Sequence, residues 1–112
     1  NRKDGKPARE EKADDGMDAK ARRQLAAQKR EQLRPLKKQV EKLEKQLADC
    51  ESQLEKTEAS LGDESLYTDD SRKNEMNGLL GDQARLKKQH DELEGALLEA
   101  MEALEEAESS LE

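Results

Sequence analysis

The residues best placed to do chemistry in this chain are the cations of a strongly basic segment, residues 20–45. This segment holds ten Lys and Arg against three Glu, a net charge of +7. Four of the cations recur at every fourth residue, namely Arg30, Arg34, Lys38 and Lys42. A helix would align them along one side at intervals of about 6 Å, which suits contact with successive phosphates of a nucleic acid. With one aromatic residue in the whole chain, binding would be independent of base sequence and steeply weakened by salt.

Residues that could catalyse a reaction are few. Cys50 and His90 could form a thiol–imidazole dyad or hold a metal, but both fall on the hydrophobic seams described below. We therefore interpret Cys50 as a small buried residue and His90 as a polar residue that sets register. None of the six glycines belongs to a phosphate loop that ends in Lys and Ser or Thr. The sequence predicts no catalytic residue, no metal site and no cofactor in this part of the protein.

The composition favours long helices over a globular core. Of the 112 residues, 44% are charged and 1% aromatic, and sixteen are Leu. No run of 18 apolar residues is present, so we expect no contact with a membrane. A single cysteine agrees with a reducing compartment, and we expect a cytoplasmic protein. Because the first residue is Asn1, we expect a piece of a longer chain.

Two hydrophobic seams place the basic segment on the first of two long helices. Mostly apolar or small residues recur in alternating steps of three and four from Leu33 to Leu61, and again from Met76 to Leu111, where Gln83 and His90 are the polar members. This heptad pattern is typical of a coiled coil. Gly62 and the polar residues that follow it indicate a turn between the helices.

These patterns together predict an all-α fold, an antiparallel two-helix coiled-coil hairpin. Residues 1–18 lack apolar periodicity and are predicted to form a disordered linker. The hairpin is predicted over residues 19–112, with helices at about 19–61 and about 70–111 and a tip at 62–71.

The predicted register pairs residues whose numbers sum to 133, for example Leu54 with Leu79, which layers position a against position d. It sets the basic segment beside the C-terminal residues 89–112, which carry nine acids and no Lys or Arg. Two explanations of this charge segregation remain open. The helices attract each other, or the basic side binds an external polyanion.

The first seam changes frame upstream of its first leucine. The same frame selects Lys29 and Arg22, which do not suit a core, whereas a shift by one residue selects Gln28, Leu25 and Ala21. Pro35 lies beside this discontinuity and removes one helical hydrogen bond. We predict a kink or a one-residue π-bulge between Glu31 and Leu36, with a full break and a short separate helix at about 19–32 as the alternative.

Two segments resemble the C-terminal domain of bacterial ABC-F ATPases. The first is RRQLAAQKREQLRPLKKQVEKLEKQL (Arg22–Leu47), through its Arg-Arg pair, its Pro-Leu-x-Lys core and the following Leu-Glu. The second is LGDESLYTDDSRKNEM (Leu61–Met76), which resembles the hairpin tip with its Leu-Tyr and is closest to the YheS branch. The resemblance covers about residues 20–112.

The resemblance implies a parent ATPase with two ATP-binding cassettes that bind ATP and Mg, no membrane domain, and a role in translation at the ribosome. In the related Uup proteins this domain is a DNA-binding coiled-coil hairpin. The residues that match the family pattern by position are Arg22, Arg23, Arg34, Pro35, Leu36, Lys37 and Tyr67, with Arg30 as a further member. By the same resemblance, Pro35 sets the angle at which the hairpin leaves the cassette, and Leu66 and Tyr67 cap its far end. The acidic C-terminal segment departs from the Uup pattern and makes ribosomal RNA as plausible a ligand as DNA.

We therefore predict a monomeric nucleic-acid-binding module rather than an enzyme. Its predicted phosphate ligands are Arg22, Arg23, Lys29, Arg30, Arg34, Lys37, Lys38 and Lys42, and its predicted structural residues are Pro35, Leu36 and Tyr67. The alternative is a spacer or protein-docking coiled coil without affinity for nucleic acid. An intermolecular dimer would need a second apolar face, and neither predicted helix has a clear one.

Overall fold

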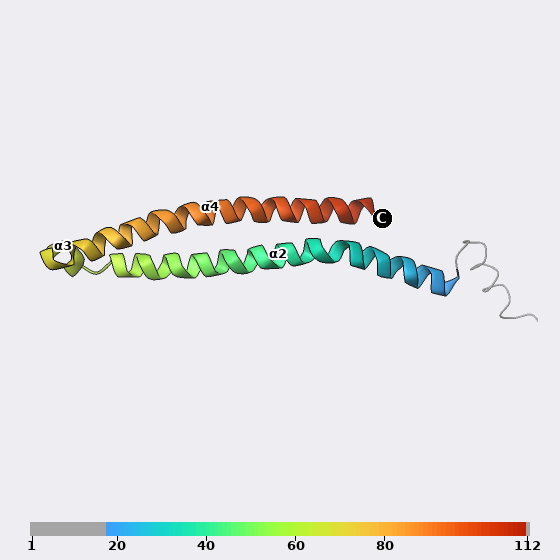
Figure 1. Cartoon of the computed structure of the whole chain (residues 1–112), viewed down its shortest axis with the longest axis horizontal. Helices are drawn as coiled ribbons and strands as arrows, with labels where there is room; N and C mark the ends of the chain where they lie inside the picture. Colours follow the sequence, from blue (N-terminus) through green and yellow to red (C-terminus); the bar gives the residue numbers. More distant parts are fainter. Residues whose placement is uncertain (1–17, 112) are drawn as a thin grey trace, which may run out of the picture.

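A computed structural model describes residues 18–111 of the chain. Two long helices, α2 (Ala19–Leu61) and α4 (Lys73–Ser110), are joined by the short helix α3 (Ser65–Thr68) and a 3-10 turn (Asp70–Arg72). Figure 1 shows α2 and α4 side by side, with the chain turning back at α3. The all-α class is confirmed, and the two long helices pack against each other as a hairpin.

The side chain of Asp18 caps the N-terminus of α2. Asp18 Oδ1 accepts a hydrogen bond of 2.7 Å from the backbone N–H of Ala21, which satisfies one of the unpaired donors of the first turn. Asp18 was assigned to the predicted linker, and it forms part of the helix terminus instead. The other linker residues, 1–17, lie outside the described part of the chain.

The seam predicted from the heptad pattern is the core of the hairpin. Between Leu33 and Leu61, every seam position is buried or half-buried and every other position is exposed. The second seam follows the same rule from Met76 to Leu111, with Ala96 as one additional half-buried residue. The most buried side chains are Leu43, Cys50, Leu61, Leu66 and Leu86. A fully buried leucine contributes roughly 1.5 to 3 kcal/mol, so these positions carry much of the stability.

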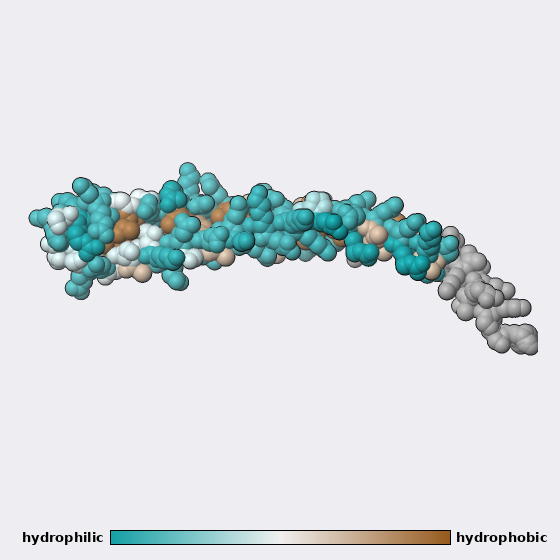
Figure 2. Space-filling view, turned by 60° about the horizontal axis from the view of Figure 1, so that its bottom comes forward, coloured by the Kyte–Doolittle hydropathy of each residue, from teal (hydrophilic) through white to brown (hydrophobic). Residues whose placement is uncertain are grey.

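Burial is uneven along the hairpin. All five buried side chains lie in the part that we call the tip half, residues 43–97. In the basal half, residues 18–42 and 98–111, the seam positions are only half-buried. On the face drawn in Figure 2, strongly apolar colour appears mainly toward the tip, and the rest of the surface is largely hydrophilic.

α2 remains a single α-helix through Pro35. The predicted π-bulge and the alternative break, with a short separate helix, are therefore wrong. Proline in a helix interior removes a hydrogen bond and crowds the carbonyl one turn earlier, and a bend relieves this crowding without ending the helix. Figure 1 shows such a bend, because the blue N-terminal part of α2 turns away from the line of the remaining helix.

Because α2 contains no bulge that would shift the pattern by one residue, the seam frame of Leu33–Leu61 continues upstream of Pro35. Lys29 and Ala26 are half-buried in that frame, while Gln28 is exposed and Leu25 is 40% exposed. The predicted one-residue shift is thus wrong at Gln28 and Leu25. Ala21 is half-buried, as the shifted frame required.

The register of the two helices differs from the predicted one by about one heptad. Glu51 Oε2 lies 2.8 Å from His90 Nε2, and Gln83 donates a hydrogen bond of 3.1 Å to Glu58. The residue numbers of both pairs sum to 141 instead of 133. Registers one heptad apart bury the same residues, so the seam pattern cannot distinguish them. The connection between the helices selects one of these two registers, because α3 and the start of α4 lie beyond the end of α2 (Figure 1).

Arg72 holds the connection between the helices in place. Its guanidinium donates to Asp63 at 2.9 Å, to Glu75 at 2.9 and 3.0 Å, and to the Ser65 hydroxyl. These charge-assisted hydrogen bonds hold the pKa of Asp63 and that of Glu75 below their usual values.

Leu66 and Tyr67 occupy different environments at the far end of the seam. Leu66 is 2% exposed and closes the last apolar layer. Tyr67 is 59% exposed, and its hydroxyl donates to the backbone carbonyl of Leu61 near the end of α2. Leu66 therefore covers the seam, while Tyr67 fastens the helix end by a hydrogen bond.

Candidate nucleic-acid interface

Four of the predicted phosphate ligands line one open groove on α2. These are Arg30, Arg34, Lys37 and Lys38. The groove has a volume of about 550 Å³, and its other lining residues are Ala27, Glu31 and Glu41. Residues three and four positions apart share one side of a helix, which is why these side chains converge. We refer to this feature as the basic groove.

The remaining predicted ligands lie outside the basic groove. Lys42 is exposed one turn beyond it. Lys29 occupies a seam position and is half-buried, as a lysine can be when its aliphatic stem covers apolar surface. Arg22 and Arg23 are exposed on the first turns of α2, which extend past the end of α4 in Figure 1. Of the predicted structural residues, Pro35 lies inside α2 and Leu36 is half-buried in the seam.

An ion pair within the basic groove was missed by the sequence analysis. Arg34 Nη2 lies 2.7 Å from Glu31 Oε2, and both side chains are more than half exposed. The spacing of three residues between an acid and a base on one helix is the signal that could have revealed it. Exposed pairs of this kind are weak, so a phosphate can compete with Glu31 for the guanidinium.

Within residues 18–111, the cations of the basic groove make no contact-distance ion pair with α4. Among residues 18–111, the ion pairs near the tip are those of Arg72, and the others on α4 involve Arg85 with Asp82 and His90 with Glu51 and Glu94. The groove cations contribute only the pair of Arg34 with Glu31 of their own helix. Attraction between the groove cations and α4 therefore acts over longer distances, where salt screens it.

Cys50 and His90 each have another partner. Cys50 is 3% exposed, and its thiol donates to the backbone carbonyl of Leu86 at 3.4 Å. The imidazole of His90 contacts Glu51 through Nε2, and its Nδ1 lies 3.6 Å from Glu94. The hydrogen bond with Glu51 raises the pKa of His90 above its ordinary value.

His90 also belongs to a small cluster of ligand-type groups. His90, Asp91 and Glu94 each bring one ligand atom to within 4.8 Å of the others. Both acids are exposed to solvent, and the histidine is engaged across the helices by Glu51. We interpret this cluster as acidic side chains that interact with the His90 imidazole at the seam, and not as a metal site.

Comparisons of the chain with protein-family models, curated proteins and solved structures give no match. Within the described residues, neither long helix has an apolar stretch sufficient to cross a membrane.

Proposed function

We propose that this hairpin is a nucleic-acid-binding module that contacts the phosphates of DNA or ribosomal RNA through the basic groove. The observation that carries the proposal is the convergence of Arg30, Arg34, Lys37 and Lys38 on one open groove. Phosphate contacts of this kind supply most of the affinity of nonspecific binding. The hairpin binds and positions its ligand, and the chemistry belongs to other parts of the parent protein.

The two cation types in the basic groove have different roles in this proposal. The planar guanidinium groups of Arg30 and Arg34 can each contact two oxygens of one phosphate. Lys37 and Lys38 act as point charges beside them. When a phosphate arrives, Arg34 exchanges its exposed partner Glu31 for the ligand. Binding therefore releases counterions and weakens as salt increases.

The resemblance to the ABC-F C-terminal domain supports the same proposal. Three groove residues, Arg30, Arg34 and Lys37, are among those that match the family pattern. We propose that the parent chain is an ABC-F ATPase that acts in translation, with its ATP and Mg sites in the cassettes. Pro35, inside α2, then sets the angle at which the hairpin leaves those cassettes.

The test is a charge reversal with a matched control. The groove variant carries Arg30→Glu, Arg34→Glu and Lys38→Glu, and the control carries Lys56→Glu, Lys87→Glu and Lys88→Glu. All six residues are exposed and both variants change the net charge equally, so helix content should stay near that of the wild type. Titrations use duplex DNA, branched DNA and a ribosomal RNA fragment at low salt.

We expect the groove variant to lose at least tenfold in affinity for the preferred nucleic acid, and the control to lose much less. Equal losses in both variants would mean that binding depends on overall charge and would contradict the role of the basic groove. If the wild type binds none of the three ligands, the hairpin is a spacer or protein-docking arm, as its long paired helices would also allow.

A further inference from the structure

Two large apolar side chains lie together on the exposed surface of α4. Leu98 is 63% exposed and Met101 is 46% exposed. Residues three positions apart on a helix are neighbours, so these two side chains form one apolar patch. Among residues 18–111, the other large exposed apolar side chains come from α2, α3 and the tip end of α4, namely Leu25, Tyr67 and Leu80.

Acidic residues flank the apolar patch along the same side of α4. Six exposed residues follow one another there in steps of three and four, namely Asp91, Glu94, Leu98, Met101, Glu105 and Glu108. Such steps keep residues on one side of a helix, so two acids precede the patch and two follow it. We call these six residues the acidic stripe.

The charge of the acidic stripe is not balanced within the described residues. Residues 89–112 contain nine acids and no Lys or Arg. Among residues 18–111, Glu94 pairs with His90, whereas Glu105 and Glu108 form no ion pair. Acids near the C-terminus of a helix also oppose its dipole, and the last turn of α4 has no basic residue to offset them. The acids therefore weaken α4, and a cationic partner would relieve this penalty.

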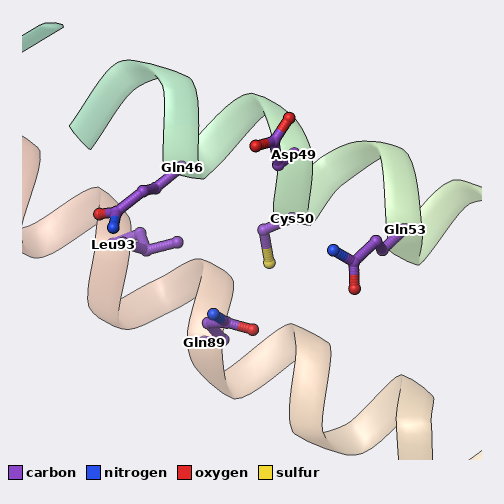
Figure 3. Close-up of a pocket in the computed structure, with 6 residues that line it drawn as sticks. All are labelled: Gln46, Asp49, Cys50, Gln53, Gln89 and Leu93. Atoms are coloured by element: carbon purple, nitrogen blue, oxygen red, sulfur yellow. The ribbon is translucent and has the colours of Figure 1, made fainter. Parts of the chain in front are cut away.

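Another side of the hairpin offers a surface of different character. Three glutamines from both long helices, Gln46, Gln53 and Gln89, line a hollow of about 260 Å³ around Cys50 (Figure 3). The apolar residues of this hollow are covered, because Cys50 is buried and Leu93 is half-buried. The hollow has no exposed apolar anchor, so the acidic stripe is the surface that combines apolar contact with strong charge.

We propose that the acidic stripe binds a cationic amphipathic helix of a partner protein. The apolar patch packs against apolar side chains of that helix, and the flanking acids contact Lys or Arg toward both of its ends. Steps of three and four are also the spacing of a coiled-coil seam, so the partner lies along α4 as a third helix. The stripe extends over residues 91–108, about 26 Å of helix at 1.5 Å per residue, which sets the length of the partner segment.

The charge of the acidic stripe selects its partner. Its acids repel a nucleic acid or an anionic membrane, which makes cationic protein segments the complementary ligands. Two copies of this chain that met stripe against stripe would place the same acids face to face. The basic groove lies on α2 and attracts ligands of the opposite charge, so this interaction does not depend on nucleic-acid binding.

The first test measures binding of three fluorescent peptides to the full 112-residue chain by anisotropy at physiological salt. One peptide of about 18 residues has Leu on one helical face and Lys on the other. The second replaces every Lys by Glu, and the third replaces every Leu by Gln. We expect the chain to bind the first peptide at least tenfold more tightly than either of the others. Equal affinity for the first and third peptides would show attraction to charge alone and would overturn the proposal.

A pair of variants tests the apolar patch. Leu98→Gln with Met101→Gln should lower the affinity for the Leu/Lys peptide at least tenfold. The control, Leu25→Gln with Leu80→Gln, changes two other exposed leucines in the same way and should stay within about twofold of the wild type. Equal losses in the two variants would mean that the peptide binds elsewhere, against the proposal.

A second pair of variants tests the flanking acids. Glu105→Gln with Glu108→Gln should weaken binding of the Leu/Lys peptide roughly three- to tenfold. Glu99→Gln with Glu106→Gln removes the same charge from residues of α4 that line a different surface, and should weaken it less. Equal losses would show that only the net charge of α4 matters and would contradict the role of the stripe.

Light scattering of the chain without peptide distinguishes a partner protein from a second copy. We expect a mass of 12.7 kDa for the wild type. A larger mass that Leu98→Gln with Met101→Gln abolishes would mean that the stripe binds another copy of this chain, and would overturn the proposal.

Discussion

The two halves of the hairpin share one heptad pattern but differ in packing. In the tip half, Cys50 and Leu86 are at most 3% exposed, and polar contacts link the helices at Glu51 with His90 and at Glu58 with Gln83. In the basal half, no seam side chain is fully buried, and those from Lys29 to Val40 and from Ala100 to Leu111 are half-buried. The basic groove lies in that half. Buried apolar surface is therefore concentrated near the tip, and in the proposed function the basal half carries the charge that binds nucleic acid.

The largest expected effect tests where the stability resides. Leu86→Ala removes a side chain that is 2% exposed and should lower the free energy of unfolding by about 2 to 5 kcal/mol. Leu104→Ala, at a half-buried seam position of the basal half, should lower it by a smaller amount because part of that side chain is already in water. Urea unfolding followed by circular dichroism measures both. Similar losses would show that the halves are equally packed.

Pro35→Ala should make the basal half more stable. The substitution restores a helical hydrogen bond and removes a steric clash, which together are worth up to about 3 kcal/mol in a helix interior. Amide hydrogen exchange should slow in α2 upstream of residue 35 and change little near the tip. Unchanged exchange in the basal half would show that Pro35 does not destabilise α2.

The tip half should respond to pH through His90. Its pKa is raised by the hydrogen bond to Glu51, with Glu94 and Asp91 as the other nearby acids. A raised folded-state pKa stabilises the fold fully below the unfolded value of about 6.5, and this stabilisation is lost as pH rises through the folded-state pKa. The thermal midpoint of the wild type should therefore exceed that of His90→Gln most at about pH 5.5, and the difference should shrink by about pH 9. A difference independent of pH would exclude a role for the imidazolium.

The smallest expected effect concerns the acid within the basic groove. Glu31→Gln frees Arg34 from its exposed ion pair and should tighten nucleic-acid binding by roughly two- to fivefold. Glu55→Gln, an equal charge change at an exposed position in the tip half, is the control. If both variants gain the same affinity for nucleic acid, the effect comes from net charge and not from competition between Glu31 and phosphate for Arg34.

Much of the fold could be predicted because a heptad pattern specifies which residues are buried. The seam from Leu33 to Leu61 is an example. The register could not be predicted, since a shift by one heptad buries the same residues and only the connection held by Arg72 distinguishes the two. At Pro35, the pattern showed a disturbance, but a continuous helix can absorb it by bending.

The candidate site was partly visible in the sequence. The four-residue spacing located Arg30, Arg34 and Lys38 in the basic groove, and the resemblance added Lys37. Lys42 and Lys29 lie outside it, because a row of every fourth residue drifts around a helix and a seam position faces the partner helix.

The most direct test of the central claim is the salt dependence of duplex DNA binding by the wild type and by the groove variant Arg30→Glu, Arg34→Glu, Lys38→Glu. Each phosphate contact contributes about 0.9 to the slope of log affinity against log salt. If the three residues each contact a phosphate, the slope should fall in magnitude by about 2.7 in the groove variant. The control Lys56→Glu, Lys87→Glu, Lys88→Glu should keep the wild-type slope. Identical slopes for the wild type and the groove variant would contradict the account.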